Sequence, residues 1–294
     1  MNSDYHAQIA CLRELVEGRL TSLFAGEKAA ISLVEAMRYS LLGGGKRVRP
    51  IIALMFANAC SCNVFADGAE QRGIVDAACA LELLHVYSLI HDDLPAMDDD
   101  DTRRGKPSNH IAFGEWRAIL AGDALQAEAF GLIARCGLPP ERVVAMLSAF
   151  SDAAGIAGIC GGQTLDIEGA DDIMAIHERK TASLIVASAL IGVLAAGGLP
   201  TQLNAAREYA RSVGLAFQIR DDVLDATGDA TLLGKPVGSD EKSGKTTFFT
   251  LHGAEKCDEI IASLTRDAQR AVRAVFDDAE LLCALAEELA GREV

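Results

Sequence analysis

The chain has 294 residues and a net charge of −15 at pH 7, with 27 basic against 42 acidic side chains. This balance excludes a typical nucleic-acid binder, which needs a basic surface to neutralise phosphates. Half of the residues are hydrophobic and 23% are charged, which excludes a disordered chain and permits a large core.

Apolar residues recur at helical spacing along almost the whole sequence. Clear stripes run through 9–20, 74–92, 120–131 and 213–224, and no run alternates as a half-buried strand would. Breaks are expected at the glycine, proline and asparagine clusters of 43–45, 63–68, 95–107, 137–140, 161–162, 197–200 and 228–244. The pattern predicts a single all-α domain over 1–294, a bundle of roughly ten helices.

One stretch, 181–206, contains no charged residue and up to Leu199 is long enough to cross a bilayer. Its serines and glycines favour a helix buried at the centre of a helical protein, so we expect no membrane span. The first residues lack the basic and apolar regions of a signal peptide. Eight dispersed cysteines indicate reduced core residues. A cytoplasmic protein is therefore expected.

The first acidic cluster follows an apolar helix. Asp92 and Asp93 end this helix, where unpaired carboxylates are costly. Pro95 removes a backbone donor, so the helix should end near Leu94, and the loop could return Asp98 toward Asp92. Such oxygen ligands, with room for water, suit Mg²⁺.

The second acidic cluster lies on one face of a predicted helix. Asp221 and Asp225 are four residues apart, Asp222 and Asp225 are three apart, and Gln218 lies one turn earlier. Carboxylates that repel one another among apolar neighbours need a cation. Two such clusters on separate helices, each followed by basic residues, therefore indicate cation binding.

Basic residues accompany both clusters. Three cations, Lys46, Arg47 and Arg49, follow a run of three glycines at a helix entry, where backbone N–H groups also favour anions. The remaining cations of this set are Arg103, Arg104, Lys180, Lys235 and Lys245. Together they predict a pocket for more than one phosphate-bearing group, some of it bound through Mg²⁺.

At this point the chain resembles the trans-prenyl diphosphate synthases, the head-to-tail isoprenoid chain elongases, from about Leu42 to Thr250. The motifs that carry the resemblance are Gly45-Lys46-Arg47-Val48-Arg49-Pro50, the aspartate-rich segment ending in Arg103-Arg104-Gly105-Lys106-Pro107, Ala121-Gly122-Asp123-Ala124, Gly161-Gly162-Gln163, Lys180-Thr181 and the second Asp-Asp-x-x-Asp. The resemblance implies the isoprenoid synthase fold, an all-α bundle around a deep apolar cavity, and a homodimer.

The resemblance also implies a role for each site residue. Asp92, Asp98 and Asp221 would hold Mg²⁺, three ions with substrate bound, with Asp93, Asp222 and Asp225 in support. Arg103, Lys180, Lys235 and Lys245 would bind the allylic diphosphate, and Lys46, Arg49, His85 and Arg104 would bind isopentenyl diphosphate. Thr181 and Gln218 would place oxygen dipoles near the allylic cation.

Two residues bear on the product length. Tyr87 lies five residues before Asp92, beside Ser88, and the helical rise places it about 7 to 8 Å below Asp92, where a growing tail would descend. The aromatic and the long spacing between Asp93 and Asp98 resemble the bacterial farnesyl diphosphate synthases (geranyltranstransferases). The expected activity is therefore prenyl transfer to give farnesyl diphosphate, with a geranylgeranyl or geranyl diphosphate synthase as the alternative.

Other classes fit the residues less well. Glu82 and His85 form a Glu-x-x-His, but a di-iron carboxylate bundle needs a second such motif. A non-catalytic partner subunit would be expected to lack one acidic cluster, and a terpene cyclase needs no second diphosphate site. The departures from the family pattern are Phe248-Phe249 in place of Tyr-Pro, Ile111 in place of Lys, and Trp116 after Glu115; none is an expected Mg²⁺ ligand.

Overall fold

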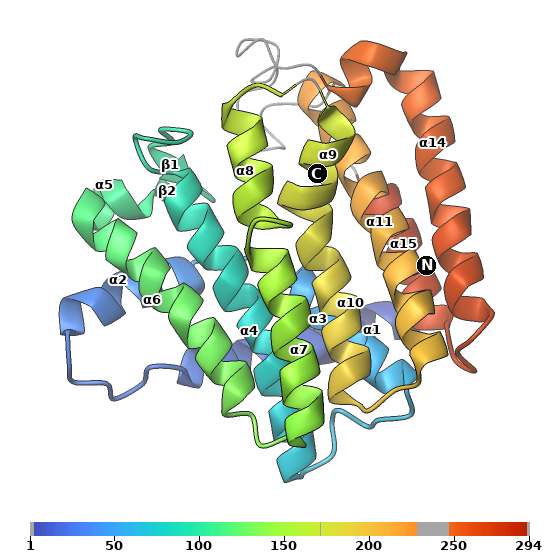
Figure 1. The fold of residues 1–294 in the computed structure, drawn as a ribbon, viewed down its shortest axis with the longest axis horizontal. Coiled ribbons are helices and arrows are strands. Elements are labelled where there is room, and N and C mark those ends of the chain that lie inside the picture. Colours follow the sequence, from blue (N-terminus) through green and yellow to red (C-terminus); the bar gives the residue numbers. More distant parts are fainter. Residues whose placement is uncertain (1–2, 171, 228–246, 293–294) are drawn as a thin grey trace.

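The structure is a computed structural model that describes residues 3–170, 172–227 and 247–292. These residues fold into a helical bundle, which confirms the all-α prediction (Figure 1). The helices are α1 (Ser3–Ser22), α2 (Ile31–Leu41), α3 (Val48–Ala59), α4 (Ala69–Asp92), α5 (Asn109–Phe113), α6 (Glu115–Ala134), α7 (Pro140–Ala154), α8 (Ile159–Ile167), α9 (Ile173–His177), the π-helix η1 (Glu178–Ala182), α10 (Ser183–Ala195), α11 (Pro200–Thr227), α14 (Phe248–Arg273) and α15 (Glu280–Ala290).

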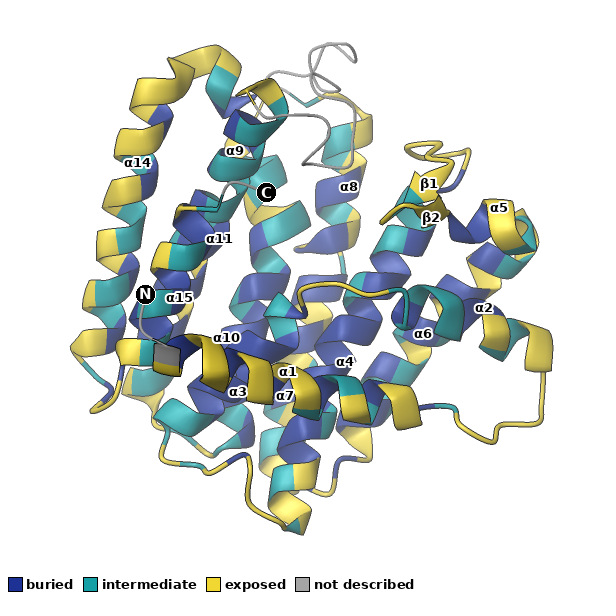
Figure 2. Cartoon of the chain, turned by 180° about the vertical axis from the view of Figure 1, so that it is seen from behind, coloured by how far each residue is buried: buried dark blue, intermediate teal, exposed yellow. Residues whose placement is uncertain are grey.

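Helix α10 lies at the centre of the bundle. It contacts α3, α4, α7 and α11, and Figure 2 shows buried residues along these central helices. The uncharged stretch from 181 onward is therefore a core helix, as expected, and its 13 residues are too few to span a bilayer. Two longer segments, Ala69–Asp92 and Pro140–Ile167, pass a length and hydropathy test for a span. The first is 78% buried within the fold, as a core helix of a soluble protein would also be.

The outer helices are amphipathic. Leu12, Val16 and Leu20 of α1 are buried on the side that faces the bundle, and the opposite side is exposed where α1 crosses the molecule in Figure 2. This confirms the first predicted stripe. Helices α11 and α14 pack along one another at the other side of the bundle (Figure 1).

Two local predictions differ from the structure. Gly161 and Gly162 lie inside α8 and do not break it. A Cβ on Gly162 would come within 2.3 Å of the Lys180 backbone nitrogen, so this glycine permits a close helix approach rather than a turn. Two short antiparallel strands, β1 (Thr102–Arg103) and β2 (Lys106–Pro107), form a hairpin. Arg104 and Gly105 at its tip both have positive φ, as in a type I′ turn.

Candidate active site

The first acidic cluster lies at the carboxyl end of α4, at the end of the bundle that carries the β1–β2 hairpin in Figure 1. The backbone N–H of Asp98 donates to the Asp92 carbonyl over 2.9 Å, so the loop does return as the sequence suggested. Burial raises the pKa of the Asp92 carboxyl to about 6, Lys180 opposes this shift, and Asp98 adds to it. A carboxylate so placed favours a nearby cation.

The guanidinium of Arg103 holds the neighbouring Asp93. Its Nε lies 2.9 Å from Asp93 Oδ1 and its Nη2 also contacts that oxygen, while Asp100 lies 3.3 Å away. Asp93 is almost fully buried, and the β1–β2 hairpin brings Arg103 back onto it. Asp93 therefore pairs with an arginine of the chain itself, and this ion pair stabilises the acidic cluster.

The second cluster lies near the carboxyl end of α11. The buried Asp222 accepts a hydrogen bond from the Phe248 backbone N–H over 2.9 Å, and one from Gln218 over 3.4 Å. Asp221 forms an ion pair with Arg292, whose guanidinium stacks 3.6 Å above the Phe217 ring. A cation of the chain thus already lies beside this cluster.

The π-helix η1 connects the two clusters. Lys180 on η1 forms a 2.6 Å ion pair with Asp166 of α8, and its charge also acts on Asp92. The next residue, Thr181, donates its hydroxyl proton to the Gln218 carbonyl oxygen over 2.9 Å. One turn of π-helix, a form common at functional sites, therefore carries both residues.

A cationic region adjoins the first cluster at the entry to α3. It consists of Lys46, Arg49, Arg104 and His85. Burial and the arginines Arg49 and Arg104 lower the pKa of His85 well below its ordinary value of 6.5. The Nε of Arg49 is buried and has no hydrogen-bond partner among the described residues, and Asp221 acts electrostatically on this arginine. Lys46 is exposed at the same entry. Cations that converge on a neutral imidazole favour an anionic ligand.

The residues expected to set the product length lie on α4 beneath Asp92. Tyr87 is buried, and its hydroxyl lies 3.3 Å from the Cys160 Sγ of α8. Its ring contacts His91 edge to face. Ser88 donates to the His85 carbonyl over 2.9 Å, so its hydroxyl is engaged by its own helix.

Two expected ligands of the allylic diphosphate, Lys235 and Lys245, lie outside the described residues. Within the described part of the chain, no three His, Cys, Asp or Glu side chains lie together as a ready metal site. The donor chemistry nevertheless suits Mg²⁺, because both helix ends present carboxylate oxygens and the Asp92 pKa is raised. A bound diphosphate would supply further oxygens.

Sequence reasoning missed three contacts around the site. Arg47, one of the three cations before α3, is buried and paired with Glu82, and a charged Glu82 inside an apolar run was the signal for such a partner. The ion pair of Asp166 with Lys180 could not be read from the sequence. Neither could that of Arg292 with Asp221, because the two residues are far apart in the chain.

Comparisons with known proteins agree with this architecture. The model of the family "Polyprenyl synthetase" matches residues 31–279. The chain belongs to this family. It is a prenyltransferase of isoprenoid biosynthesis with the isoprenoid synthase fold, as the motifs indicated.

The named relatives differ in their products. A farnesyl diphosphate synthase of Escherichia coli K12 is 42% identical over 273 residues, which are 88% of this chain and 89% of that protein. A chloroplastic geranylgeranyl pyrophosphate synthase of Capsicum annuum is also 42% identical, over 88% of this chain and 71% of that protein. The crystal structure of a geranylgeranyl pyrophosphate synthetase from Pyrococcus horikoshii superposes with a TM-score of 0.86 at 33% identity and covers 99% of each chain.

Proposed function

We propose that this prenyltransferase, a single domain over 1–294, condenses isopentenyl diphosphate head to tail with dimethylallyl or geranyl diphosphate. The product is farnesyl diphosphate, and inorganic diphosphate is released. The observation that carries the proposal is that η1 faces both acidic helices, since Lys180 acts on Asp92 of α4 and Thr181 bonds to Gln218 of α11. Asp221 of α11 in turn acts on Arg49 at the cationic entry to α3. One region suits a diphosphate bound through Mg²⁺, and the other suits a diphosphate bound directly.

The first step breaks the C–O bond of the allylic diphosphate. Asp92, Asp98 and Asp221 would hold Mg²⁺ ions, three with substrate bound, and Asp93, Asp222 and Asp225 would support them. When bound, the metal neutralises the charge that grows on the departing diphosphate. The cations that complete this subsite are Arg103, Lys180, Lys235 and Lys245. The bonding pair leaves with the diphosphate oxygen.

The second step forms the new C–C bond. Lys46, Arg49, His85 and Arg104 would hold isopentenyl diphosphate so that its double bond attacks the allylic cation. The oxygen dipoles of Thr181 and Gln218, which are hydrogen-bonded to each other, would stabilise the cation. The proton lost from the new intermediate goes to the departing diphosphate. Exclusion of water protects the cation.

The C15 product rests on Tyr87. Its buried ring on α4 and its contact with Cys160 of α8 would close the path of the tail below Asp92. A geranylgeranyl or geranyl diphosphate product is the alternative, since relatives with both farnesyl and geranylgeranyl names are equally similar. Tyr87→Ala should lengthen the product, as measured by chromatography of the dephosphorylated alcohols. An unchanged C15 product would show that Tyr87 does not limit the tail.

We also propose a homodimer in the cytoplasm. Four apolar side chains of α5 and α6 are between 43% and 59% exposed, namely Ile111, Trp116, Ile119 and Leu120. Exposed apolar patches of this kind mark protein contacts, and a second copy would cover this one. Light scattering of the purified protein measures the mass directly.

The test of the activity is incubation of the purified protein with isopentenyl and geranyl diphosphates, with Mg²⁺ and with EDTA. A metal-dependent C15 product is expected. No condensation in Mg²⁺ would refute the synthase and would favour a non-catalytic partner subunit. A C20 product would leave the chemistry intact and replace the farnesyl assignment by geranylgeranyl diphosphate.

A further inference from the structure

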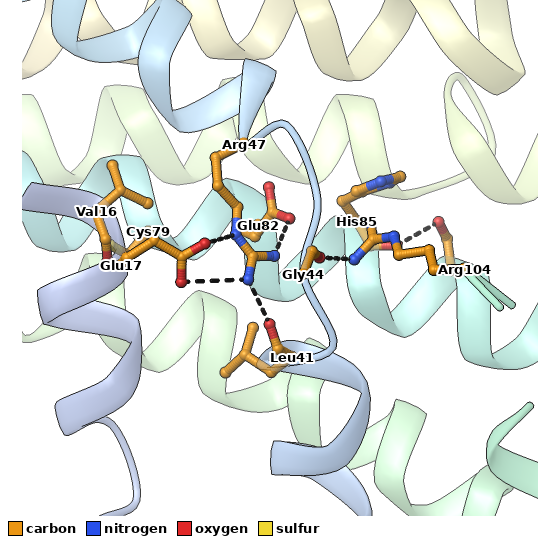
Figure 3. A network of polar contacts seen from close by, with 10 residues as sticks. Val16, Glu17, Leu41, Gly44, Arg47, Cys79, Glu82, His85 and Arg104 are labelled. Carbon is orange, nitrogen blue, oxygen red and sulfur yellow. Dashed lines mark hydrogen bonds and ion pairs between the residues drawn. The ribbon is translucent and has the colours of Figure 1, made fainter. Parts of the chain in front are cut away.

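The Arg47 side chain lies buried among the helices, next to Glu17, Glu82 and Leu41 (Figure 3). Its Nε donates to Glu17 and its Nη1 donates to Glu82, each over 2.7 Å, and its Nη2 donates to the Leu41 carbonyl over 2.8 Å. The exposed fractions of the Arg47 and Glu82 side chains are 0% and 2%. Arg47 directly precedes α3, and its guanidinium therefore binds α1, α2 and α4 at once.

The backbone at Arg47 is also unusual. Its φ of 53° and ψ of 34° are left-handed, a conformation that costs a non-glycine residue about 1 kcal/mol or more. Gly44 and Gly45 just before it have φ of 91° and 136°, and such glycines lose much freedom when ordered. The bond from Arg47 to the Leu41 carbonyl closes this loop onto the end of α2, which fixes a segment that its glycines leave loose.

The Arg47 network fixes both the entry to α3 and the part of α4 that carries His85. Lys46 directly precedes Arg47 in the chain, and Arg49 follows it by two residues. The position of the Arg47 backbone therefore fixes where the side chains of Lys46 and Arg49 start. Glu82 lies one helical turn before His85 on α4, so its bond to Arg47 ties the loop to the helix that carries the histidine. Arg104 adds a second anchor by donating to the Gly44 carbonyl (Figure 3).

We propose that Arg47, with Glu82 and Glu17, forms the positioning unit of the isopentenyl diphosphate site. Arg47 does not touch the substrate; it orients the loop whose neighbouring residues do. The planar fork of arginine suits three partners at once, which lysine cannot match. Buried ion pairs contribute little net stability, and here the network sets a geometry. The inference rests on the proposed function, because that function assigns isopentenyl diphosphate to these cations.

Steady-state kinetics with both substrates tests the positioning unit. Glu82→Gln and Arg47→Lys should raise the KM for isopentenyl diphosphate about tenfold, whereas kcat and the KM for geranyl diphosphate should change less than twofold. The matched control is Asp76→Asn, which removes an ion pair between the same two helices α1 and α4, that of Asp76 with Arg19. It should leave both KM values unchanged. Calorimetric titration with isopentenyl diphosphate in EDTA should show the same loss without turnover.

The outcomes separate this inference from the proposed function. A wild-type protein that does not condense the substrates refutes the function, and the titrations then decide the positioning role on their own. Equal losses in kcat and in both KM values, or no loss in either variant, would overturn the positioning role. If Glu82→Gln fails to fold, the kinetics and titration of Glu17→Gln decide the positioning role. The Glu17 side chain is 36% exposed, so its substitution should destabilise the fold less.

Discussion

Helix α4 carries two regions that perturb their titratable groups in opposite ways. At His85, burial and nearby arginines lower the pKa of the imidazole. Seven residues later, which is about 10 Å along the helix, burial raises the pKa of Asp92 to about 6. Asp98 and Asp93 also raise the Asp92 pKa, against the opposing charges of Lys180 and Arg103. The contrast supports the proposed division, in which one region would bind a diphosphate directly and the other would bind a diphosphate through its metal.

The largest effect is expected when the acidic region loses its charge. Asp92→Asn should lower kcat about 10²- to 10³-fold, the size of losing one electrostatic stabiliser of a transition state. The KM for isopentenyl diphosphate should change less than threefold, because that substrate binds at the cationic region. Initial rates with geranyl diphosphate at saturating Mg²⁺ measure both. Asp101→Asn is the control, since Asp101 is exposed in the same loop; equal rates for both variants would refute the assignment.

The cationic region should respond differently. Arg49→Met should raise the KM for isopentenyl diphosphate about 10- to 100-fold, since hydrogen bonds to charged groups contribute about 1.5–3 kcal/mol each. The same change should raise the melting temperature of the ligand-free protein by a few degrees, because the buried Nε of Arg49 has no hydrogen-bond partner in the part of the chain that the structure describes. Calorimetric melting and initial rates give the two readouts. Arg13→Met on the exposed face of α1 should move neither, and a destabilised Arg49→Met would contradict this interpretation.

A smaller effect concerns how the acidic region holds its own shape. Asp93 is buried and bonded to Arg103, so a double-mutant cycle of Asp93→Asn and Arg103→Ala should give a coupling energy of about 2 kcal/mol. Urea denaturation in EDTA measures it. The pair of Arg135 with Glu128, exposed on both sides, is the control and should couple by less than about 1 kcal/mol. Additive effects at Asp93 and Arg103 would mean that the pair does not shape the loop.

Features set by neighbours in the chain could be predicted from the sequence. The helix end near Leu94 follows from Pro95, and α4 ends at Asp92. The backbone bond between Asp98 and Asp92 confirms the return of the loop. The central helix followed from an uncharged stretch whose serines and glycines indicated a buried helix rather than a membrane span. Such predictions succeed because local chemistry alone decides them.

Features set by distant packing could not be predicted. Asp222 accepts from the backbone of Phe248, and Asp221 pairs with Arg292, but nothing in the spacing shows that these segments meet. In the sequence the two glycines of α8 resemble a helix break. In the structure Gly162 lies within the helix, where its missing side chain permits the close approach of η1. In the sequence Arg47 likewise resembled a phosphate-binding residue, but in the structure it pairs with Glu17 of α1 and Glu82 of α4.

The smallest effect is the pH dependence of stability, which involves His85 of the cationic region and His177 at the end of α9. Burial lowers the pKa of His85 well below 6.5 and that of His177 to about 4, so below pH 6.5 the unfolded chain binds protons that the folded chain does not. Stability should therefore fall as the pH drops, by up to about 1.4 kcal/mol per pH unit for each histidine. The raised pKa of Asp92 has the opposite effect between about 6 and 4.

His85→Gln isolates the contribution of this histidine. The variant should lose less stability than the wild type between pH 6.5 and 5, by roughly 1 kcal/mol per pH unit, in urea denaturation without metal or substrate. His6→Gln should keep the wild-type slope, since His6 is exposed. Parallel pH profiles for His85→Gln and the wild type would mean that the folded protein protonates His85 readily. The arginines around His85 would then be too well compensated to require an anion, and the contrast between the two regions of α4 would fail.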